Sequence, residues 1–250
     1  MATGYCTLED VRRALRKAQL PGDVSQDKQI AVDAIAAETE PLEKSLKRHW
    51  YAPTGSDILS EATDIDIPTE PKSRDDEEDI PTGGAHLVGE PATPKTWQDD
   101  YTRIELARRD AESTTELLVR DSDGGYTDWV ASNDYDGGPW PGALGQDYVL
   151  RVNNGGWTHL YLDTTNFLKE DADEDDEYYL DSFSNAVYVT FDYGHEGIPR
   201  NVRRAVALRA GAELVEEAVI SIPENATLYN VETKADEMRT KANELLEVYL

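Results

Sequence analysis

The chain has 250 residues, of which 51 are Asp or Glu and 24 are Lys or Arg, giving a formal net charge of −27. A surplus this large opposes nucleic-acid binding through overall charge, and in ordinary buffer it destabilises a compact fold through self-repulsion. In molar salt the Debye length falls to about 3 Å, which removes most of that cost. The composition therefore predicts adaptation to a high-salt cytoplasm, with an acidic protein of ordinary salinity that carries solvated tails as the alternative.

Length, cysteine content and hydropathy limit the number of domains, the cross-links and the membrane segments that the chain can have. A chain of this length forms one large domain or two small ones. Cys6 is the single cysteine, so neither a disulfide framework nor a cysteine-based metal cluster can form within one chain. The first twenty residues lack the apolar run of a signal peptide, and no segment approaches 18 consecutive apolar residues. We expect a soluble protein that is made in the cytoplasm and has no membrane partner.

Residues 5–50 are expected to form two helices. The first opens with the segment Thr7–Asp10, where the threonine hydroxyl can accept an orphan backbone N–H and the acid suits the positive helix end. A Pro-Gly pair at 21–22 ends it, and Ser25 is positioned to cap the second helix. The apolar faces predicted for the two helices are Leu8, Val11, Leu15 and Ala18, and then Ile30, Ala34, Ile35, Leu42 and Leu46.

Pro41 lies inside the second predicted helix. Proline removes one intrahelical hydrogen bond, and its ring clashes with the preceding turn. We therefore expect this helix to kink or split near Glu40 before the chain reaches Trp50.

The composition changes over residues 52–96. This stretch contains no Phe, Trp or Tyr, yet it holds half of the chain's twelve prolines and the charged run Arg74–Asp79. Such a segment cannot bury enough apolar surface to form its own core. We expect an extended acidic arm, with a hint of a short strand at Ile65–Ile67.

Residues 97–186 are rich in aromatic residues and in short strand-like segments. Three turn signals separate them, Asp123–Gly125, Asp136–Gly138 and Asn153–Gly155, whose Asn and Gly accept the positive φ that tight turns need. Several short strands at close spacing predict an antiparallel sheet, sandwich or small barrel, interrupted by an acidic loop at 171–177. The predicted strands are 103–106, 116–119, 126–130, 148–152 and 157–162.

A strand and a long helix follow from residue 187 to residue 222. Apolar residues at 187, 189 and 191 alternate with polar ones, as in a half-buried strand. Gly194 and Gly197 end the strand, and Pro199 suits the first turn of a helix. Two adjacent apolar stripes predict that the helix is buried over most of its circumference. The stripes are Ala205, Leu208, Ala212, Val215, Val219 and Ile222, and then Ala207, Gly211, Leu214 and Ala218.

A last helix is expected from about Thr233 to the end of the chain, after a break at Pro223. One stripe of this helix is apolar, and its final turn is apolar as well. An apolar end on so acidic a chain predicts that the helix docks against another surface. The residues concerned are Met238, Leu245, Leu246 and Tyr249, following Ala235 and Ala242 on the same stripe.

The strand that ends in Tyr193–Gly194, the proline five residues later and the alanine-rich helix resemble the head–tail connector proteins of tailed viruses. These proteins are adaptors that form a ring beneath the portal. The helices of residues 5–50 fit the same family, so the resemblance covers roughly a third of the chain, at its two ends. Together with the salt adaptation, it points to a tailed virus that infects a haloarchaeon.

The resemblance implies an α+β fold in which residues 1–51 and 187–250 form a helical bundle. The arm (52–96) and the β-rich region (97–186) would be a large antiparallel insertion. It also implies a homo-oligomeric ring, usually of twelve copies, in the virion neck between the portal protein and the downstream neck, stopper or tail protein. Genomic double-stranded DNA would pass through the ring, and an acidic lumen would repel its phosphates.

Two basic groups interrupt the acidic sequence. The first predicted helix carries Arg12, Arg13 and Arg16, and the long helix carries Arg200, Arg203, Arg204 and Arg209. Either group could contact phosphates. In an oligomer of acidic subunits we instead expect both groups to meet carboxylates of a neighbour, with the apolar C-terminal residues at the subunit or portal interface.

The sequence offers no recognisable catalytic motif. The four histidines are scattered at positions 49, 86, 159 and 195, and neither a nucleophile elbow nor a phosphate-binding loop is present. Asp171, Asp173 and Asp175 resemble part of a calcium loop, but Asp176 and Ser182 replace the glycine and the bidentate glutamate such a loop needs. We predict a non-enzymatic protein without a cofactor, in which these three aspartates are the candidate ligands for a structural cation.

A function of another class also fits the sequence. Trp129, Trp140 and Trp157 lie near turn signals, where the aromatic platforms of carbohydrate-binding modules occur. The alternative is therefore a halophilic β-sandwich that binds a carbohydrate or another ligand. A monomer that binds glycans would favour it, and a ring without a ligand would favour the adaptor.

Overall fold

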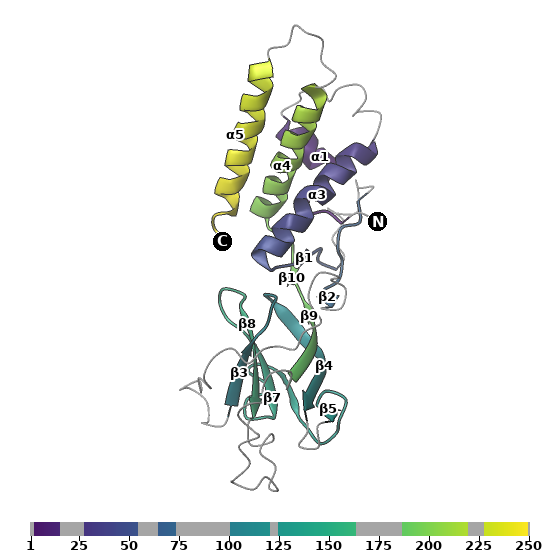
Figure 1. The fold of residues 1–250 in the computed structure, drawn as a ribbon, viewed down its shortest axis with the longest axis vertical. Helices are drawn as coiled ribbons and strands as arrows, with labels where there is room; N and C mark the ends of the chain where they lie inside the picture. The colour runs from purple at the N-terminus through teal and green to yellow at the C-terminus, as the bar shows by residue number, and fades with distance from the viewer. Residues whose placement is uncertain are drawn as a thin grey trace. The chain divides into compact units, whose positions relative to one another are not determined.

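The structure is a computed structural model of the chain, and the contacts within it define two compact units (Figure 1). One unit comprises Met1–Glu70 with His195–Leu250, and the other comprises Pro71–Gly194. The described part of the chain contains four helices and several mostly antiparallel sheets, so the predicted α+β class is confirmed. The structure describes residues 3–15, 28–54, 65–73, 101–120, 125–163, 187–219 and 228–249.

The first unit is organised around α4 (Arg200–Val219), which contacts the other three helices, α1 (Leu8–Ala14), α3 (Lys28–Leu46) and α5 (Leu228–Leu246). Figure 1 shows α4 between α3 and α5. The two apolar stripes predicted for α4 are confirmed as core over its described side chains. Small residues let the helices approach closely, and the fully or almost fully buried positions of α4 are Val202, Ala205, Val206, Ala207, Ala210, Ala212 and Leu214.

Gly211 shows how tight this helix packing is. A Cβ atom added at Gly211 would lie 2.7 Å from the Cε atom of Met238 on α5, closer than carbon atoms can approach. The glycine therefore leaves room for the end of the Met238 side chain against the backbone of α4. Leu15, which follows α1, lies on the other side of the same position, 3.5 Å from that Cβ site.

The capping box predicted at the start of α1 is confirmed. The Thr7 hydroxyl accepts the Asp10 backbone N–H at 3.2 Å, and the Asp10 carboxylate accepts the Thr7 backbone N–H at 3.0 Å. The same carboxylate accepts a hydrogen bond from the Arg203 side chain on α4. Asp10 therefore closes the helix end and joins the N-terminal and C-terminal segments of the chain.

Replacing Asp10 with Asn should lower the free energy of unfolding by about 1–3 kcal/mol, because it removes a charge-assisted bond and weakens the cap. Burial alone would raise the pKa of Asp10, but the hydrogen bonds from Arg203 and Thr7 outweigh burial and hold that pKa below its ordinary value. A lowered pKa stabilises the fold above the unfolded-state value, and this contribution is lost as the pH falls through the folded-state pKa. Denaturant unfolding between pH 2 and pH 7 should therefore show a weaker acid dependence in Asp10→Asn.

Glu9→Gln is the matched control, because Glu9 lies one residue away and its ion-pair partners among the described residues are Arg12 and Arg13 at the surface. Exposed pairs of this kind contribute little. Equal effects of the two substitutions would show that the bond to Arg203 does not stabilise the fold.

Of the kink or split predicted near Glu40, the split is wrong, since α3 runs without interruption from Lys28 to Leu46. Pro41 and Ala37, whose carbonyl would otherwise accept the missing N–H, both lie on the exposed face of α3. Water can hydrate that carbonyl there, so the helix loses one bond without burying an unsatisfied group. The opposite face of α3 carries the core residues Ala34, Ile35, Leu42 and Leu46, as predicted.

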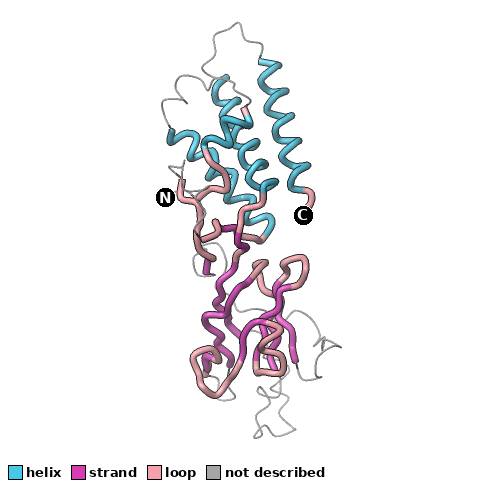
Figure 2. Tube along the Cα trace, turned by 180° about the vertical axis from the view of Figure 1, so that it is seen from behind, coloured by secondary structure: helices cyan, strands magenta, loops and turns pink. Residues whose placement is uncertain are grey.

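The second unit consists of two four-stranded sheets that share one apolar core, and Figure 2 shows its strands in magenta. The first sheet has the order β2-β9-β4-β5 and the second has the order β3-β8-β7-β6. The sandwich named among the sequence predictions is therefore the arrangement present. The strands of the first sheet are Lys72–Ser73, Val187–Tyr193, Ala111–Arg120 and Tyr126–Asp128, and those of the second are Tyr101–Glu105, Thr158–Asp163, Tyr148–Val152 and Gly137–Pro139.

One predicted turn of this unit is confirmed and another is wrong. The hairpin at Asn153 connects antiparallel β7 and β8, and the Asn153 side chain accepts the backbone N–H groups of Gly155 and Trp157. Asp136–Gly138 does not form a hairpin, because Gly137–Pro139 is strand β6 and pairs in parallel with β7. Gly137 is needed for close approach, since a Cβ atom there would lie 2.3 Å from the Tyr148 ring.

The two units divide the chain after Glu70 and after Gly194, whereas the grouping expected from the sequence divides it after residues 51, 96 and 186. β9 was grouped with the C-terminal helices, whereas the second unit includes it and ends at Gly194. Within the arm, Ile65 packs into the core of the first unit and Asp66 bridges to Thr3, while Lys72–Ser73 pairs with β9. The remaining parts of the arm, at 55–64 and 74–96, lie outside the described residues.

Two further differences concern the start of α5 and a short strand pair in the first unit. α5 begins at Leu228, five residues before the predicted start, and no Pro or Gly between 226 and 232 opposes helix there. The first unit also contains a short parallel pair between β1 (Trp50–Tyr51) and β10 (His195–Glu196). None of the helices in the described ranges has the length and apolar character needed to cross a membrane.

Candidate interaction surfaces

The arginines predicted on the two helices fall into paired and exposed groups. Arg203 binds Asp10, and Arg209 donates to Asn243 at 2.8 Å and lies 3.8 Å from Glu38, so both hold the helices of one chain together. The arginines that remain candidates for the predicted contact with a neighbour's carboxylates are therefore the exposed ones. Arg12 and Arg13 are exposed beside Glu9. Arg200 and Arg204 are exposed and have no ion-pair partner among the described residues. Arg16 lies outside the described ranges.

The apolar residues predicted at an interface have partners within their own unit. Met238 and Leu246 are buried core residues, and Leu245 and Tyr249 are partly buried against the same core. The Tyr249 ring packs edge-on against Trp50, with centroids 5.9 Å apart. Sequence reasoning identified the right apolar stripe, but the structure supplies an intramolecular surface for it.

A buried polar cluster in the first unit was missed by sequence reasoning. His49 Nδ1 lies 2.8 Å from the Glu43 carboxylate and 3.2 Å from the Tyr5 hydroxyl, and that hydroxyl accepts the Trp50 backbone N–H at 3.1 Å. Glu43 and His49 have side-chain exposures of 6% and 0%, so a substrate cannot reach them in this structure. We interpret the cluster as a structural hydrogen-bond network that holds the N-terminal segment, α3 and β1 together.

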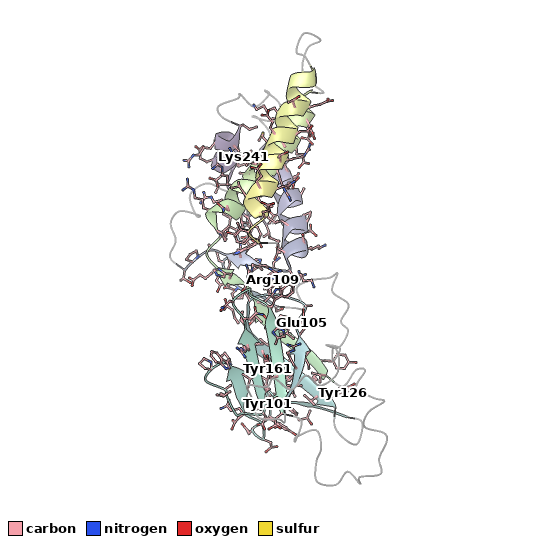
Figure 3. The ribbon with its side chains drawn as sticks, turned by 90° about the vertical axis from the view of Figure 1, so that its left-hand side faces the viewer. Tyr101, Glu105, Arg109, Tyr126, Tyr161 and Lys241 are labelled. Carbon is pink, nitrogen blue, oxygen red and sulfur yellow. The ribbon has the colours of Figure 1, made fainter. Side chains whose placement is uncertain are left out.

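The outer side of the sheet β3-β8-β7-β6 is buried where Tyr101, Val149 and Tyr161 pack with Ala143. Beside that cluster it carries cationic and aromatic side chains, and we call this part the arginine face. Core residues Ile104, Leu160 and Leu150 point to the inner side of this sheet, so their strand neighbours point outward. Figure 3 labels Glu105 and Tyr161 on these strands. The arginine face comprises Arg103, Glu105, Arg151 and His159, together with the adjacent Trp140.

Strand register brings the members of the arginine face together. His159 on β8 lies opposite Glu105 on β3 and opposite Arg151 on β7. Burial of the ring lowers the pKa of His159, and the positive charges of Arg103 and Arg151 lower it further, although Glu105 acts in the opposite direction. The lowered pKa favours the neutral form of His159, so the charged groups around it are Arg103, Arg151 and Glu105.

The tryptophans of the predicted carbohydrate platform do not share one surface role. Trp129 is 2% exposed and stacks on Tyr135, with ring centroids 4.5 Å apart, so it is a core residue. Trp157 is half-buried beneath Arg109, whose guanidinium carbon lies 4.1 Å from its ring centroid. Trp140 alone among the three is strongly exposed, at 46%, with Arg151 5.3 Å from its ring centroid.

The outer surface of the other sheet, β2-β9-β4-β5, carries tyrosines and carboxylates; we call it the acidic face. Its members are Glu116 on β4, Tyr126 on β5, and Tyr188 and Asp192 on β9. Thr190 donates to Glu116 and Ser113 donates to Asp192, each at 3.2 Å, so hydroxyl groups orient both carboxylates. Every charged side chain that the structure describes on β4, β5 and β9 is acidic.

A shallow groove runs along the outer side of α5, which carries Lys241 (Figure 3). It is lined by Thr233, Asp236, Glu237, Thr240, Lys241 and Glu244, all of them polar or charged residues of this one helix, so no second element encloses a small ligand there.

Among the residues that the structure describes, no group of three His, Cys, Asp or Glu side chains is arranged to hold a metal ion. Asp171, Asp173 and Asp175 lie outside the described ranges. Within the described ranges, the candidate sites are therefore surfaces, since no pocket with convergent reactive groups is found there. In the comparisons with known proteins, no family model, no curated protein and no solved structure matches the chain.

Proposed function

We propose that this chain is a structural head–tail adaptor of a tailed virus adapted to high salt, whose copies form a ring between the portal and the next neck or tail protein. The observation that carries the proposal is the division of the chain. Its N-terminal and C-terminal segments share one helical core, while Pro71–Gly194 forms a compact unit of its own. A helical bundle with an inserted β domain is the arrangement that the resemblance implies.

The segment that bears the resemblance lies at a well-anchored corner of the fold. Backbone N–H groups of His195 and Gly197 donate to the carbonyls of His49 and Tyr51, at 2.9 and 2.7 Å. The N-terminal segment thereby fixes the path of the chain into α4. A rigid strand-to-helix corner suits a protein whose function is geometric and not catalytic.

The exposed arginines give the helical unit a means of binding its neighbours. Arg200 and Arg204 lie at the start of α4, and Arg12 and Arg13 lie on the adjoining α1. In a chain of net charge −27, the surfaces of neighbouring copies and of an acidic portal offer carboxylates to these groups. Ring formation by these contacts would also leave acidic surface for a channel through which DNA slides.

Electron microscopy of the purified chain in about 2–3 M KCl, where charge repulsion is screened, should show closed rings. Arg200→Glu with Arg204→Glu should abolish the rings without loss of helical circular dichroism, since both side chains are exposed. Arg200→Lys with Arg204→Lys is the control and should retain them.

A strictly monomeric natural chain would contradict the adaptor function. The exposed Trp140 beside Arg151 favours a second candidate, a ligand-binding β module. A monomer whose tryptophan fluorescence responds to glycans, with the response lost in Trp140→Ala, would support that candidate.

A further inference from the structure

We propose that the two outer faces of the β unit bind each other between copies of this chain, the arginine face of one copy lying against the acidic face of the next. The inference rests on the proposed function, because it assigns a second contact to the same ring. The occupant of each face is therefore another copy of this chain.

Charge is the first reason. The arginine face presents Arg103 and Arg151 in a chain with more than twice as many acidic as basic residues. Glu116 and Asp192 on the acidic face are carboxylates already oriented by hydroxyl groups, as acceptors for guanidinium need to be. Glu105 within the arginine face and the charge of −27 both disfavour a nucleic acid as the occupant.

Exposed aromatic side chains are the second reason. Trp140 is 46% exposed beside the arginine face, and Tyr126 is 42% exposed on the acidic face, where it packs edge-on against Tyr188 at 5.4 Å. Tryptophan, tyrosine and arginine are the residues that dominate the energy of protein interfaces. High salt screens charge pairs but strengthens the burial of aromatic surface, so such a mixed contact suits molar salt.

The geometry is the third reason. The two faces lie on opposite sides of one sandwich, because Leu150 and Leu160 of one sheet and Val189 and Phe191 of the other point into the shared core. A single copy cannot bring them together. Contacts between different faces are head-to-tail, and such contacts close into rings when the rotation between copies permits.

Cross-linking of the full chain tests the contact directly. Glu105→Cys places a thiol on the arginine face, and Thr115→Cys places one next to Glu116 on β4, while the natural Cys6 is fully buried. With a flexible bismaleimide in high salt, the double variant should give a ladder of covalent oligomers beyond the dimer. Each single variant should remain uncross-linked, because a head-to-tail contact never brings two identical positions together.

Charge exchange in the double-cysteine background tests the residues. Arg103→Glu with Arg151→Glu should abolish the ladder, and so should Glu116→Arg with Asp192→Arg. Combining all four substitutions, or mixing the two charge variants, should restore it. If either charge variant does not fold, Glu116→Gln with Asp192→Asn should weaken the ladder instead.

The outcomes separate this inference from the proposed function. Rings of the natural chain together with no ladder from the double-cysteine variant would overturn the inference and leave the adaptor function standing. A ladder without closed rings would support the contact and oppose the adaptor. Cross-linked dimers from a single variant, or a ladder that survives both charge variants, would overturn the head-to-tail pairing of these faces.

Discussion

Replacing Leu246 with Asp should unfold the helical unit, whereas the same substitution at Val248 should leave it folded. Leu246 is 3% exposed in the core of that unit, and Val248 is 80% exposed two residues later. Removing a buried leucine costs about 2–5 kcal/mol, and a buried, unpaired carboxylate adds a desolvation penalty. Because a typical domain has about 5–15 kcal/mol of stability, the variant should lose its cooperative helical transition in thermal or denaturant unfolding followed by circular dichroism.

The pair of substitutions separates two roles for the C-terminal helix. Both introduce the same charge near the same helix end, so a general electrostatic effect would act on them alike. The sequence alone predicts that Leu245, Leu246 and Tyr249 bury against another protein. A Leu246→Asp chain that melts normally but fails to form rings would restore that prediction and contradict the intramolecular packing.

Local patterns explain which parts of the fold can be predicted. The capping box of α1 involves residues three apart, and the alternation in β9 and the stripes of α4 record burial at the periods of a strand and a helix. The Asn153 turn is equally local, because one side chain satisfies the N–H groups of its own hairpin. In each case the pattern that decides the structure can be seen within the segment itself.

The errors arise where the deciding partner is distant. The helix α3 continues through Pro41 because the proline lies on its exposed face. Which face of α3 is exposed is decided by how the helix packs against distant segments. Gly137 resembles a turn residue in the sequence, but it lies in β6, where the absence of a side chain leaves room for the Tyr148 ring.

The arginine face could not be predicted for the same reason. Arg103, Arg151 and His159 come together only through the register of β3, β7 and β8. Sequence reasoning singled out His159 merely as one of four scattered histidines. The buried Tyr5–Glu43–His49 cluster likewise joins segments that are far apart in the chain.

Lowering the KCl concentration from molar to about 0.1 M should unfold the protein, because the Debye length rises from about 3 Å to about 10 Å. Carboxylates that are screened from one another in high salt then repel across the whole surface of a chain with net charge −27. Salt removal also weakens the effective burial of apolar groups. Trp50 and Trp129, 1% and 2% exposed, report on the cores of the two units, so tryptophan emission should shift to longer wavelength as both become hydrated.

Two controls identify repulsion as the cause. Sucrose favours compact states without screening charge, so it should rescue the low-salt state less effectively than KCl if repulsion dominates. Asp236→Lys with Glu237→Lys on the exposed side of α5 lowers the net negative charge, and it should move the unfolding midpoint to lower salt. Asp236→Glu with Glu237→Asp keeps the charge and should leave that midpoint unchanged. Emission that stays constant through the dilution would show that the acidic surplus is carried by solvated segments and does not adapt the fold to salt.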